Sequence, residues 1–496
     1  MCEKMRNVLF SCGNAPGLPT GYGGQGFLAL KAFVTSGLHV TVLAWNLSAP
    51  VFQPHTVYTT EDVIRMNPSM SDITKHDPTF PWASIRWMCN PYAQFPCTIM
   101  KRDLNKMIVD TDADLFVSLQ DIFMFEPGPF LCLSAVWLPL HFTPVEHPTV
   151  MSLSDFDIQL PISGWGATLL SALQGNETTM RHVEVVPHGR DLTVFSHSPD
   201  RGDTRTKWGW PDDAFVCLMV ASNSEESGRK AFDAQIQAFK LFQMKNPRAW
   251  LHIHAETTRA YDIPRILEIF GLFSTRSAWV DWRDNRKRTM GDAVIVGSCV
   301  SMTSAHLLTR INDSEMADLY RAADVLLAAT CSEGCGVPIL EAQLCGTPVV
   351  TNRTTAMWEE TMLGISVPPC QWIARCDFNS GWWLPDARGV AEALYDISQW
   401  PSERLDEERR KHLPRLQKEF SNETVVQKWG EVLSKCKNPK LILSSQRLQL
   451  LGVAHTLRKS LETLSLKREE YALQKNVISR QLRDATVRDY LRELLA

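Results

Sequence analysis

The chain has little of several features that mark particular classes of protein. It has no basic surplus, since 51 Lys and Arg stand against 55 Asp and Glu and give a net charge of -4. Broad nucleic-acid binding is excluded because no cationic excess is available to neutralise a run of phosphates. None of the 13 cysteines forms a C-x-x-C pair. We interpret them as buried or free thiols of a reducing compartment, not as a disulfide or zinc framework.

Long apolar runs are also missing. The longest, FLCLSAVWL at 130–138, lies between two prolines and is about half as long as a membrane span. It predicts a buried strand. The N-terminus MCEKMRNVLF enters an apolar strand directly, without the core of a signal peptide. We therefore expect a cytoplasmic protein with no transmembrane segment.

What is present is an ordinary globular composition, with 44% hydrophobic and 21% charged residues among 496. Short apolar strands alternate with helical stretches through both halves, which is typical of parallel sheets covered by helices on both faces. The predicted fold class is α/β, with two Rossmann-like doubly wound domains. The segment VVPHGRDLTVF at 185–195 is polar and holds a proline and a glycine, as an inter-domain joint does.

This pattern predicts four regions. Residues 1–190 form an N-terminal domain and residues 191–400 a C-terminal domain. Charged helices at 401–440 return toward the N-terminal domain, and a helical tail follows at 441–496. The tail repeats apolar residues every seven positions, but Arg468 and Lys475 occupy positions that a coiled-coil seam would fill with apolar groups. An amphipathic helix that packs on its own protein is favoured over self-association through the tail.

The stretch GYGGQGF at 21–27 spells G-x-G-x-x-G, the fingerprint of a dinucleotide site. In that fingerprint the glycines follow the first strand at once, and an acidic residue ends the second strand. Here eight residues separate Gly21 from strand NVLFSC, and LAWNLS holds no acid. NAD binding is therefore disfavoured. The glycines either let backbone amides approach a phosphate or sugar, or form a tight turn that leads into a helix.

The most informative segment is CSEGCGVPILEAQLCGTPVV at 331–350. It follows strand DVLLAAT, so residues 333–336 form a loop at a strand's carboxyl end, where open α/β sheets bind ligands, and Val337 begins a helix. Glu333 and Glu341 are eight residues apart. Both carboxylates suit hydrogen bonds from sugar hydroxyls. The alternative is that they only favour the positive end of the helix dipole.

The segment resembles the signature of retaining glycosyltransferases of family 4, E-G-x-G-x-P-x-x-E-A-x-x-x-G-x-P-V, at every fixed position. The serine that precedes it lies one residue nearer the glutamate than in the family. VVPHGRDLTVF is similar to the family's inter-domain segment, GYGGQGF matches its N-domain glycine loop, and GRKAFDAQIQAFKLF is similar to its K-G helix, with Ala231 in place of the usual glycine. The resemblance covers most of residues 6–435.

The resemblance implies a GT-B fold, in which two Rossmann-like domains face each other across a cleft. It implies transfer of a sugar from a UDP- or GDP-sugar to an acceptor hydroxyl with retention, without metal or cofactor. Lys230 would bind the diphosphate, since a fixed cation stabilises the charge that grows on the leaving group. Arg229 would replace an arginine that the family places where Glu225 stands.

The remaining implied contacts concern the donor and acceptor. Glu333 would contact hydroxyls of the donor sugar and Glu341 the ribose of the nucleotide. Backbone groups of the signature loop and of the N-terminal glycines would hold the donor; these are Gly334, Cys335, Gly336, Val337, Gly23 and Gly24. The Cys335 thiol itself stands where the family usually has an aromatic residue and is expected to be incidental.

The segment LPLHFTPVEHPT supplies candidates to hold or deprotonate the acceptor hydroxyl, namely His141, Glu146 and His147. If the departing phosphate takes the proton, as the family is thought to do, no dedicated base is needed. Two D-x-D strings, at 112–114 and 155–157, are interpreted as caps or turns and not as metal sites.

The acceptor class stays open among glycans, proteins and lipids. Two alternatives to a glycosyltransferase remain at this stage. One is a sugar-nucleotide epimerase or hydrolase of the same fold. The other is a non-catalytic scaffold that binds nucleotide sugars.

Overall fold

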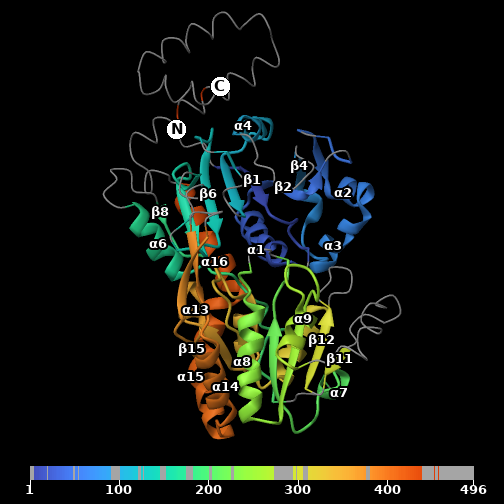
Figure 1. The fold of residues 1–496 in the computed structure, drawn as a ribbon. Coiled ribbons are helices and arrows are strands. Elements are labelled where there is room, and N and C mark those ends of the chain that lie inside the picture. The colour runs from blue at the N-terminus through green and yellow to red at the C-terminus, as the bar shows by residue number, and fades with distance from the viewer. Residues whose placement is uncertain are drawn as a thin grey trace, which may run out of the picture. The chain divides into compact units, whose positions relative to one another are not determined.

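The fold is taken from a computed structural model of the 496-residue chain (Figure 1). The structure describes residues 5–437 together with Gly452 and Thr456. The gaps within this range are 19, 49–50, 54, 91–100, 121–124, 127, 144, 146–151, 175–181, 200–203, 225–227, 273–293, 298, 305–310 and 376–379. The chain divides into two compact units, and the main division falls between Gly189 and Arg190.

Unit 1 contains one mixed sheet. Its strands are β1 (Asn7–Cys12), β2 (His39–Ser48), β3 (Val57–Thr59), β4 (Arg86–Asn90), β5 (Leu115–Leu119), β6 (Leu133–Leu138), β7 (Ile158–Pro161) and β8 (His182–Val183). The helices of this unit are α1 (Gly21–Thr35), α2 (Thr60–Met66), α3 (Asp72–His76), α4 (Lys101–Asp110), α6 (Gly164–Gln174) and α16 (Asn422–Cys436), with short 3₁₀ turns at Pro68–Ser71 and Trp82–Ser84.

The strand order of unit 1 is β3-β4-β2-β1-β5-β6-β7-β8, and only β3 runs antiparallel to its neighbour. Every residue of β5 and β6 is buried, as expected where helices cover both faces of a parallel sheet. The run at 130–138 therefore contributes β6, which begins only at Leu133. The prediction of a buried strand there is confirmed.

One sequence-based expectation for unit 1 is wrong. The stretch GYGGQGF is not a loop but the first two turns of α1, because Thr20 caps the helix by accepting from the amide of Gly23 at 2.9 Å. A Cβ at Gly23 would lie 2.3 Å from the carbonyl oxygen of Leu18, and one at Gly26 would lie 2.7 Å from the sulfur of Cys12. The glycines thus permit close packing of the helix on its own N-terminal turn and on β1.

Unit 2 contains a second sheet. Its strands are β9 (Phe215–Val220), β10 (Ala249–Ala255), β11 (Val294–Gly297), β12 (Val300–Ser304), β13 (Val325–Ala328), β14 (Val349–Asn352) and β15 (Gly364–Val367). A separate hairpin pairs β16 (Gln371–Arg375) with β17 (Ser380–Leu384). The helices are α7 (Thr204–Lys207), α8 (Phe232–Lys245), α9 (Ile263–Ile269), α11 (Asp313–Ala322), α12 (Val337–Leu344), α13 (Thr355–Glu360), α14 (Ala387–Ser398) and α15 (Ser402–Phe420).

The strand order of unit 2 is β11-β12-β10-β9-β13-β14-β15. All pairs are parallel except β11 with β12. Strands β11 and β12 form a hairpin, because the two-residue link between them leaves no room for a crossover helix. Helices α8 and α14 lie side by side on this unit (Figure 1).

The chain passes between the units at four points, and Arg190 is bonded within unit 2 to the residues that precede the last of these points. The amide of Arg190 donates to the carbonyl of Phe420 at 2.8 Å, and the amide of Asn422 donates to the carbonyl of Arg190 at 3.0 Å. Helix α15 belongs to unit 2, while α16 packs in unit 1, where Trp429 contacts Phe33 and Trp137. Residues 140–144 are grouped with unit 2, although the sequence reading placed them in 1–190.

The tail predicted at 441–496 lies outside the described residues, apart from Gly452 and Thr456. Within the described part of the chain, no helix combines the length and apolar character needed to cross a membrane.

Candidate functional site

The signature segment forms the turn between a buried strand and a helix in unit 2. Strand β13 is buried throughout, and α12 begins at Val337 with Pro338 in its first turn. Proline fits there because the amide it lacks would have no partner within the helix. The loop Glu333–Gly336, called the 333–336 loop below, therefore lies at the carboxyl end of a parallel strand, the usual ligand position in such sheets.

The structure brings the adjacent residues Arg229 and Lys230 to Glu333, which lies 104 and 103 positions from them in sequence. Arg229 Nη1 and Lys230 Nζ each lie 2.7 Å from a different carboxylate oxygen of Glu333. Arg229 also donates to the carbonyl of Ser332 at 2.7 Å. Its side chain is 10% exposed, against 16% for Lys230. Lys230 is thus the cation that is more accessible to a ligand.

The charges of these three groups determine the ionisation of Glu333. Burial raises the pKa of this carboxyl, but the neighbouring Arg229 and Lys230 lower it further, so the net pKa lies below the usual 4.5. Glu333 is ionised at neutral pH. Two cations and one anion leave one net positive charge beside the loop.

We expect this ion pair to stabilise the protein above about pH 4.5 and to lose its effect as the pH falls through the lowered pKa of Glu333. The unfolded chain takes up the proton first, so acidification favours unfolding. Urea unfolding at pH 7 and pH 4 should show a smaller loss of stability on acidification for Glu333→Gln than for the wild type. Equal losses would contradict the ion pair's contribution.

The backbone amides of the loop and of Val337 differ in whether they donate to an acceptor within the protein. The amide of Gly336 donates to Glu360 Oε2 at 2.9 Å, and the amide of Val337 donates to the carbonyl of Cys335 at 3.0 Å. Within the residues that the structure describes, the amides of Gly334 and Cys335 donate to no protein acceptor. Of the four backbone groups predicted to hold a donor sugar, these two have unused donors.

The buried Glu360 and the partly buried Cys335 keep their protons. Burial raises the pKa of Glu360 to about 8, against a smaller lowering by its bond from Gly336. Burial, with the adjacent carboxyl of Glu360, raises the pKa of the Cys335 thiol well above 9. A protonated thiol is a poor nucleophile, which agrees with the incidental role expected for Cys335.

Glu341 engages different partners from Glu333. One carboxylate oxygen lies 2.9 Å from Nε of Arg190, and the other accepts from the hydroxyl of Tyr320 at 2.9 Å. Burial and the charge of Glu341 raise the pKa of that hydroxyl well above 10, so it stays a donor. Sequence reasoning missed Arg190, although it quoted the joint that contains it, because nothing local pairs it with Glu341.

Ala231 stands where a glycine is expected from the resemblance, and its backbone explains that preference. The residue has φ 46° and ψ 43°, the left-handed region that favours glycine. Its side chain is buried with Cys331 and Trp382, against Phe142 and Ile373. The chain thus keeps the left-handed turn before α8 and fills the space with a methyl group.

The other predicted residues are placed as follows. In the first turn of α1, the amide of Gly23 donates to the hydroxyl of Thr20 and that of Gly24 to its carbonyl, while a Cβ at Gly24 would meet nothing within 4 Å. His141 lies in the 140–144 segment of unit 2, with its ring 3.9 Å from that of Phe142. Glu146 and His147 lie outside the described residues.

Three aspartates of the two D-x-D strings accept hydrogen bonds from backbone amides. Asp114 accepts from the amides of Arg6 and Asn7, Asp155 from the amide of Gly128, and Asp157 from the amide of Ser134. These bonds join segments 23 to 108 positions apart, so these aspartates hold distant backbone segments together instead of capping a helix or closing a turn, as the sequence predicts. No group of three His, Cys, Asp or Glu side chains suited to a metal occurs in the described part of the chain.

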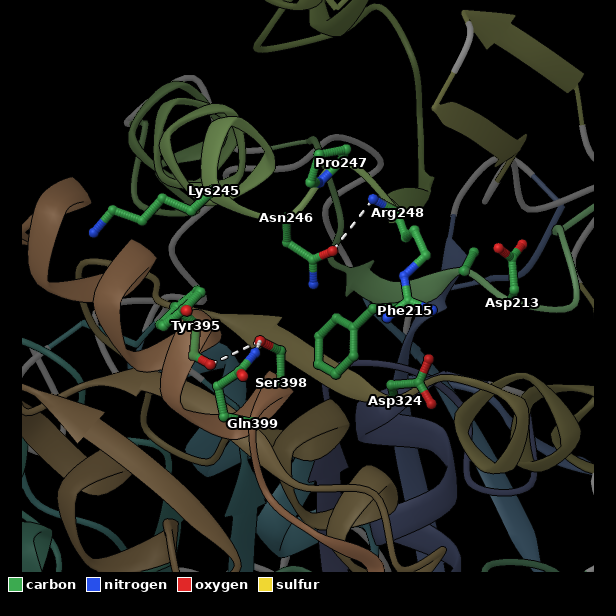
Figure 2. A pocket seen from close by; sticks show the side chains of 11 residues that line it. Asp213, Phe215, Lys245, Asn246, Pro247, Arg248, Asp324, Tyr395, Ser398 and Gln399 are labelled. Carbon is green, nitrogen blue, oxygen red and sulfur yellow. Dashed lines mark hydrogen bonds between the residues drawn. The ribbon is translucent and has the colours of Figure 1, made fainter.

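A cavity of about 390 Å³ lies elsewhere on unit 2 (Figure 2). Phe215 and Asp324 line it, at the amino ends of β9 and β13. Lys245 and Tyr395 line it from the last turns of α8 and α14. Since the 333–336 loop follows the carboxyl end of β13, the cavity and the loop lie at opposite edges of the sheet.

Known proteins share both sequence and fold with this chain. A profile of the family described as Glycosyl transferases group 1 matches residues 293–376. The resemblance to group 1 glycosyl transferases is confirmed. D-inositol 3-phosphate glycosyltransferase of Kineococcus radiotolerans is 30% identical over 168 residues, which are 34% of this chain and 33% of that protein. The match thus spans about a third of the length of this curated relative.

The fold comparison covers more of the chain. Sucrose-phosphate synthase of Thermosynechococcus elongatus aligns with 87% of this chain and 98% of its own, at 15% identity and a TM-score of 0.55. HepE of Anabaena, in a complex with UDP and glucose, aligns with 87% of this chain and 100% of its own, at 14% identity and a TM-score of 0.57. The chain has the GT-B fold, with two units whose sheets are mostly parallel.

Proposed function

We propose that this chain is a glycosyltransferase that moves a sugar from a UDP- or GDP-sugar to an acceptor hydroxyl, with retention of configuration and without a metal. The observation that carries the proposal is the arrangement of Arg229, Lys230 and Glu333 beside the 333–336 loop. A net positive charge and two unused amides at the end of a parallel strand suit a sugar linked to a diphosphate.

Each group has a role in this proposal. Lys230 binds the diphosphate and stabilises the charge that develops as the bond between the anomeric carbon and the phosphate oxygen breaks. Arg229, which is bonded to Ser332 and Glu333, adds a second positive charge and holds the loop. A carboxylate offers about four lone-pair positions. Glu333 uses two for the cations, so further positions are left for sugar hydroxyls.

The amides of Gly334 and Cys335 donate to the donor sugar. Glu341, which also contacts Arg190 and Tyr320, binds the ribose of the nucleotide. The acceptor oxygen attacks the anomeric carbon on the face from which the nucleoside diphosphate leaves, and a phosphate oxygen takes the acceptor proton. The products are the glycoside and the nucleoside diphosphate. The relatives support a nucleotide-sugar donor, since the HepE complex holds UDP and glucose. The acceptor is a glycan, a protein or a lipid.

The proposal is tested with a panel of UDP- and GDP-sugars, each with and without a mixture of glycan and lipid acceptors, in the presence of EDTA. We expect release of nucleoside diphosphate that depends on an acceptor, and NMR of the product should show the anomeric configuration of the donor. Turnover of the donor alone would indicate a hydrolase or epimerase instead. Binding of a nucleotide sugar without any turnover would indicate a scaffold.

A further inference from the structure

Helix α13, which begins at Thr355, contacts both ends of the 333–336 loop. At the first end, the amide of Glu333 donates to Oγ1 of Thr355 at 3.0 Å, and the carbonyl of Glu333 accepts from the amide of Ala356 at 3.3 Å. At the other end, Glu360 accepts from the amide of Gly336 at 2.9 Å. Three hydrogen bonds therefore fix the backbone of the loop from one side.

The backbone of Thr355 is strained. Its φ is 49°, and a β-branched residue at a positive φ is a genuine outlier. Such a conformation costs on the order of 1–3 kcal/mol and persists only where the surroundings enforce it. Thr355 is 5% exposed, and its hydroxyl meets the amide of Glu333. The strained conformation is the one in which the hydroxyl accepts from the loop.

Glu360 is held in place by α12. Gln343, which is fully buried, donates to the carbonyl of Glu360 at 2.8 Å and accepts from the amides of Met362 and Leu363. Glu360 itself is 2% exposed. Since α12 carries Glu341, the same helix fixes both Glu341 and the end of α13. Neither Thr355 nor Glu360 was singled out by the sequence.

We propose that Thr355 and Glu360 are positioning residues, which hold the 333–336 loop so that the amides of Gly334 and Cys335 point to the donor sugar, an inference that rests on the proposed function. The amides of Glu333 and Gly336 donate to Thr355 and Glu360, and the two amides between them stay available to a ligand. Loss of either contact lets the loop rotate and misdirects those amides. Donor binding then weakens although no ligand contact has been removed.

Thr355→Gly is the informative variant, because it removes the hydroxyl and at the same time permits the positive φ without strain. We expect the Tm to stay at or above that of the wild type. We expect hydrogen exchange at the amide of Glu333 to rise and the KM for the donor to increase by about five- to tenfold, with a smaller change in kcat. Thr355→Ser keeps the hydroxyl and should retain the amide exchange and the donor KM of the wild type.

A second pair of variants tests the other end of the loop. Glu360→Gln keeps an oxygen that accepts from Gly336, whereas Glu360→Leu does not, so only the leucine variant should raise exchange and the donor KM. Asp112→Gly is the matched control for strain, since Asp112 also has a positive φ, 47°, but lies in a turn of unit 1. It should leave the donor KM unchanged.

Two outcomes separate this inference from the proposed function. If loop exchange and donor KM stay within twofold of the wild type in both Thr355→Gly and Glu360→Leu, the positioning role is wrong. If loop exchange rises in these variants but wild-type protein neither binds nor turns over any nucleotide sugar by calorimetry and assay, the loop contacts are supported and the proposed function is wrong.

Discussion

Replacing Lys230 with alanine is expected to lower kcat/KM for sugar transfer by about 10²–10³-fold, which corresponds to about 2.7–4 kcal/mol in the barrier. The reason is that Lys230 is the more exposed cation beside the 333–336 loop, at 16% exposure, and its ammonium is the group able to follow the charge on the leaving diphosphate. Folding should survive, because Arg229 remains 2.7 Å from the carboxylate of Glu333.

Steady-state release of nucleoside diphosphate measures this effect, and circular dichroism checks the fold. Lys245→Ala is the matched control, since Lys245 ends the helix α8 that follows Lys230 and lines the cavity at the opposite edge of the sheet. It should retain full activity. A loss of kcat/KM of less than tenfold for Lys230→Ala would show that Lys230 does not stabilise the leaving group.

Glu333→Ala is expected to destabilise unit 2 by about 3–5 kcal/mol, because the buried Arg229 and the partly buried Lys230 would keep their charges without a carboxylate. Lys230 can turn toward solvent more easily than Arg229, so the lower end of that range is favoured. At roughly 2–4 °C per kcal/mol for a domain of this size, the Tm should fall by about 6–12 °C. Activity should be lost as well.

Calorimetry gives the Tm, and urea unfolding followed by tryptophan fluorescence gives the change in free energy. The matched control is Glu419→Ala, which removes the carboxylate of an exposed pair with Arg415 on α15, with side chains 43% and 64% exposed. Exposed pairs contribute about 0–1 kcal/mol. Similar losses in the two variants would show that burial of the Glu333 cluster adds nothing.

The elements near the site show how far local patterns reach. The stretch DVLLAAT and the segment at 331–350 predict a strand, a loop and a helix with proline in its first turn, and the structure has β13, the 333–336 loop and α12 there. The same reading placed a loop at GYGGQGF, where α1 begins at Gly21. Glycines fit a loop and a closely packed helix equally well. The close approach of Leu18 to Gly23, which shows that the helix is closely packed, cannot be inferred from the sequence pattern.

The candidate site itself was only partly predictable. Arg229, Lys230 and Glu333 were each named from their segments, but the 2.7 Å distances from Glu333 to the two cations depend on β9 and β13 being neighbours in the sheet. Thr355 and Glu360 gave no signal, because a threonine and a glutamate in a short helix are common. Their contacts to Glu333 and Gly336 arise from the packing of α13 on α12.

The sequence by itself determined the α/β class, the two sheet-forming halves and the position of the 333–336 loop. Alternating apolar segments and the punctuation by glycine and proline are local properties that the chain carries in any conformation. Only the tertiary structure decided which charges meet Glu333 and which loop amides remain unused. Those outcomes depend on contacts between residues about 20 to 100 positions apart, which exist only after the sheet and its helices have packed.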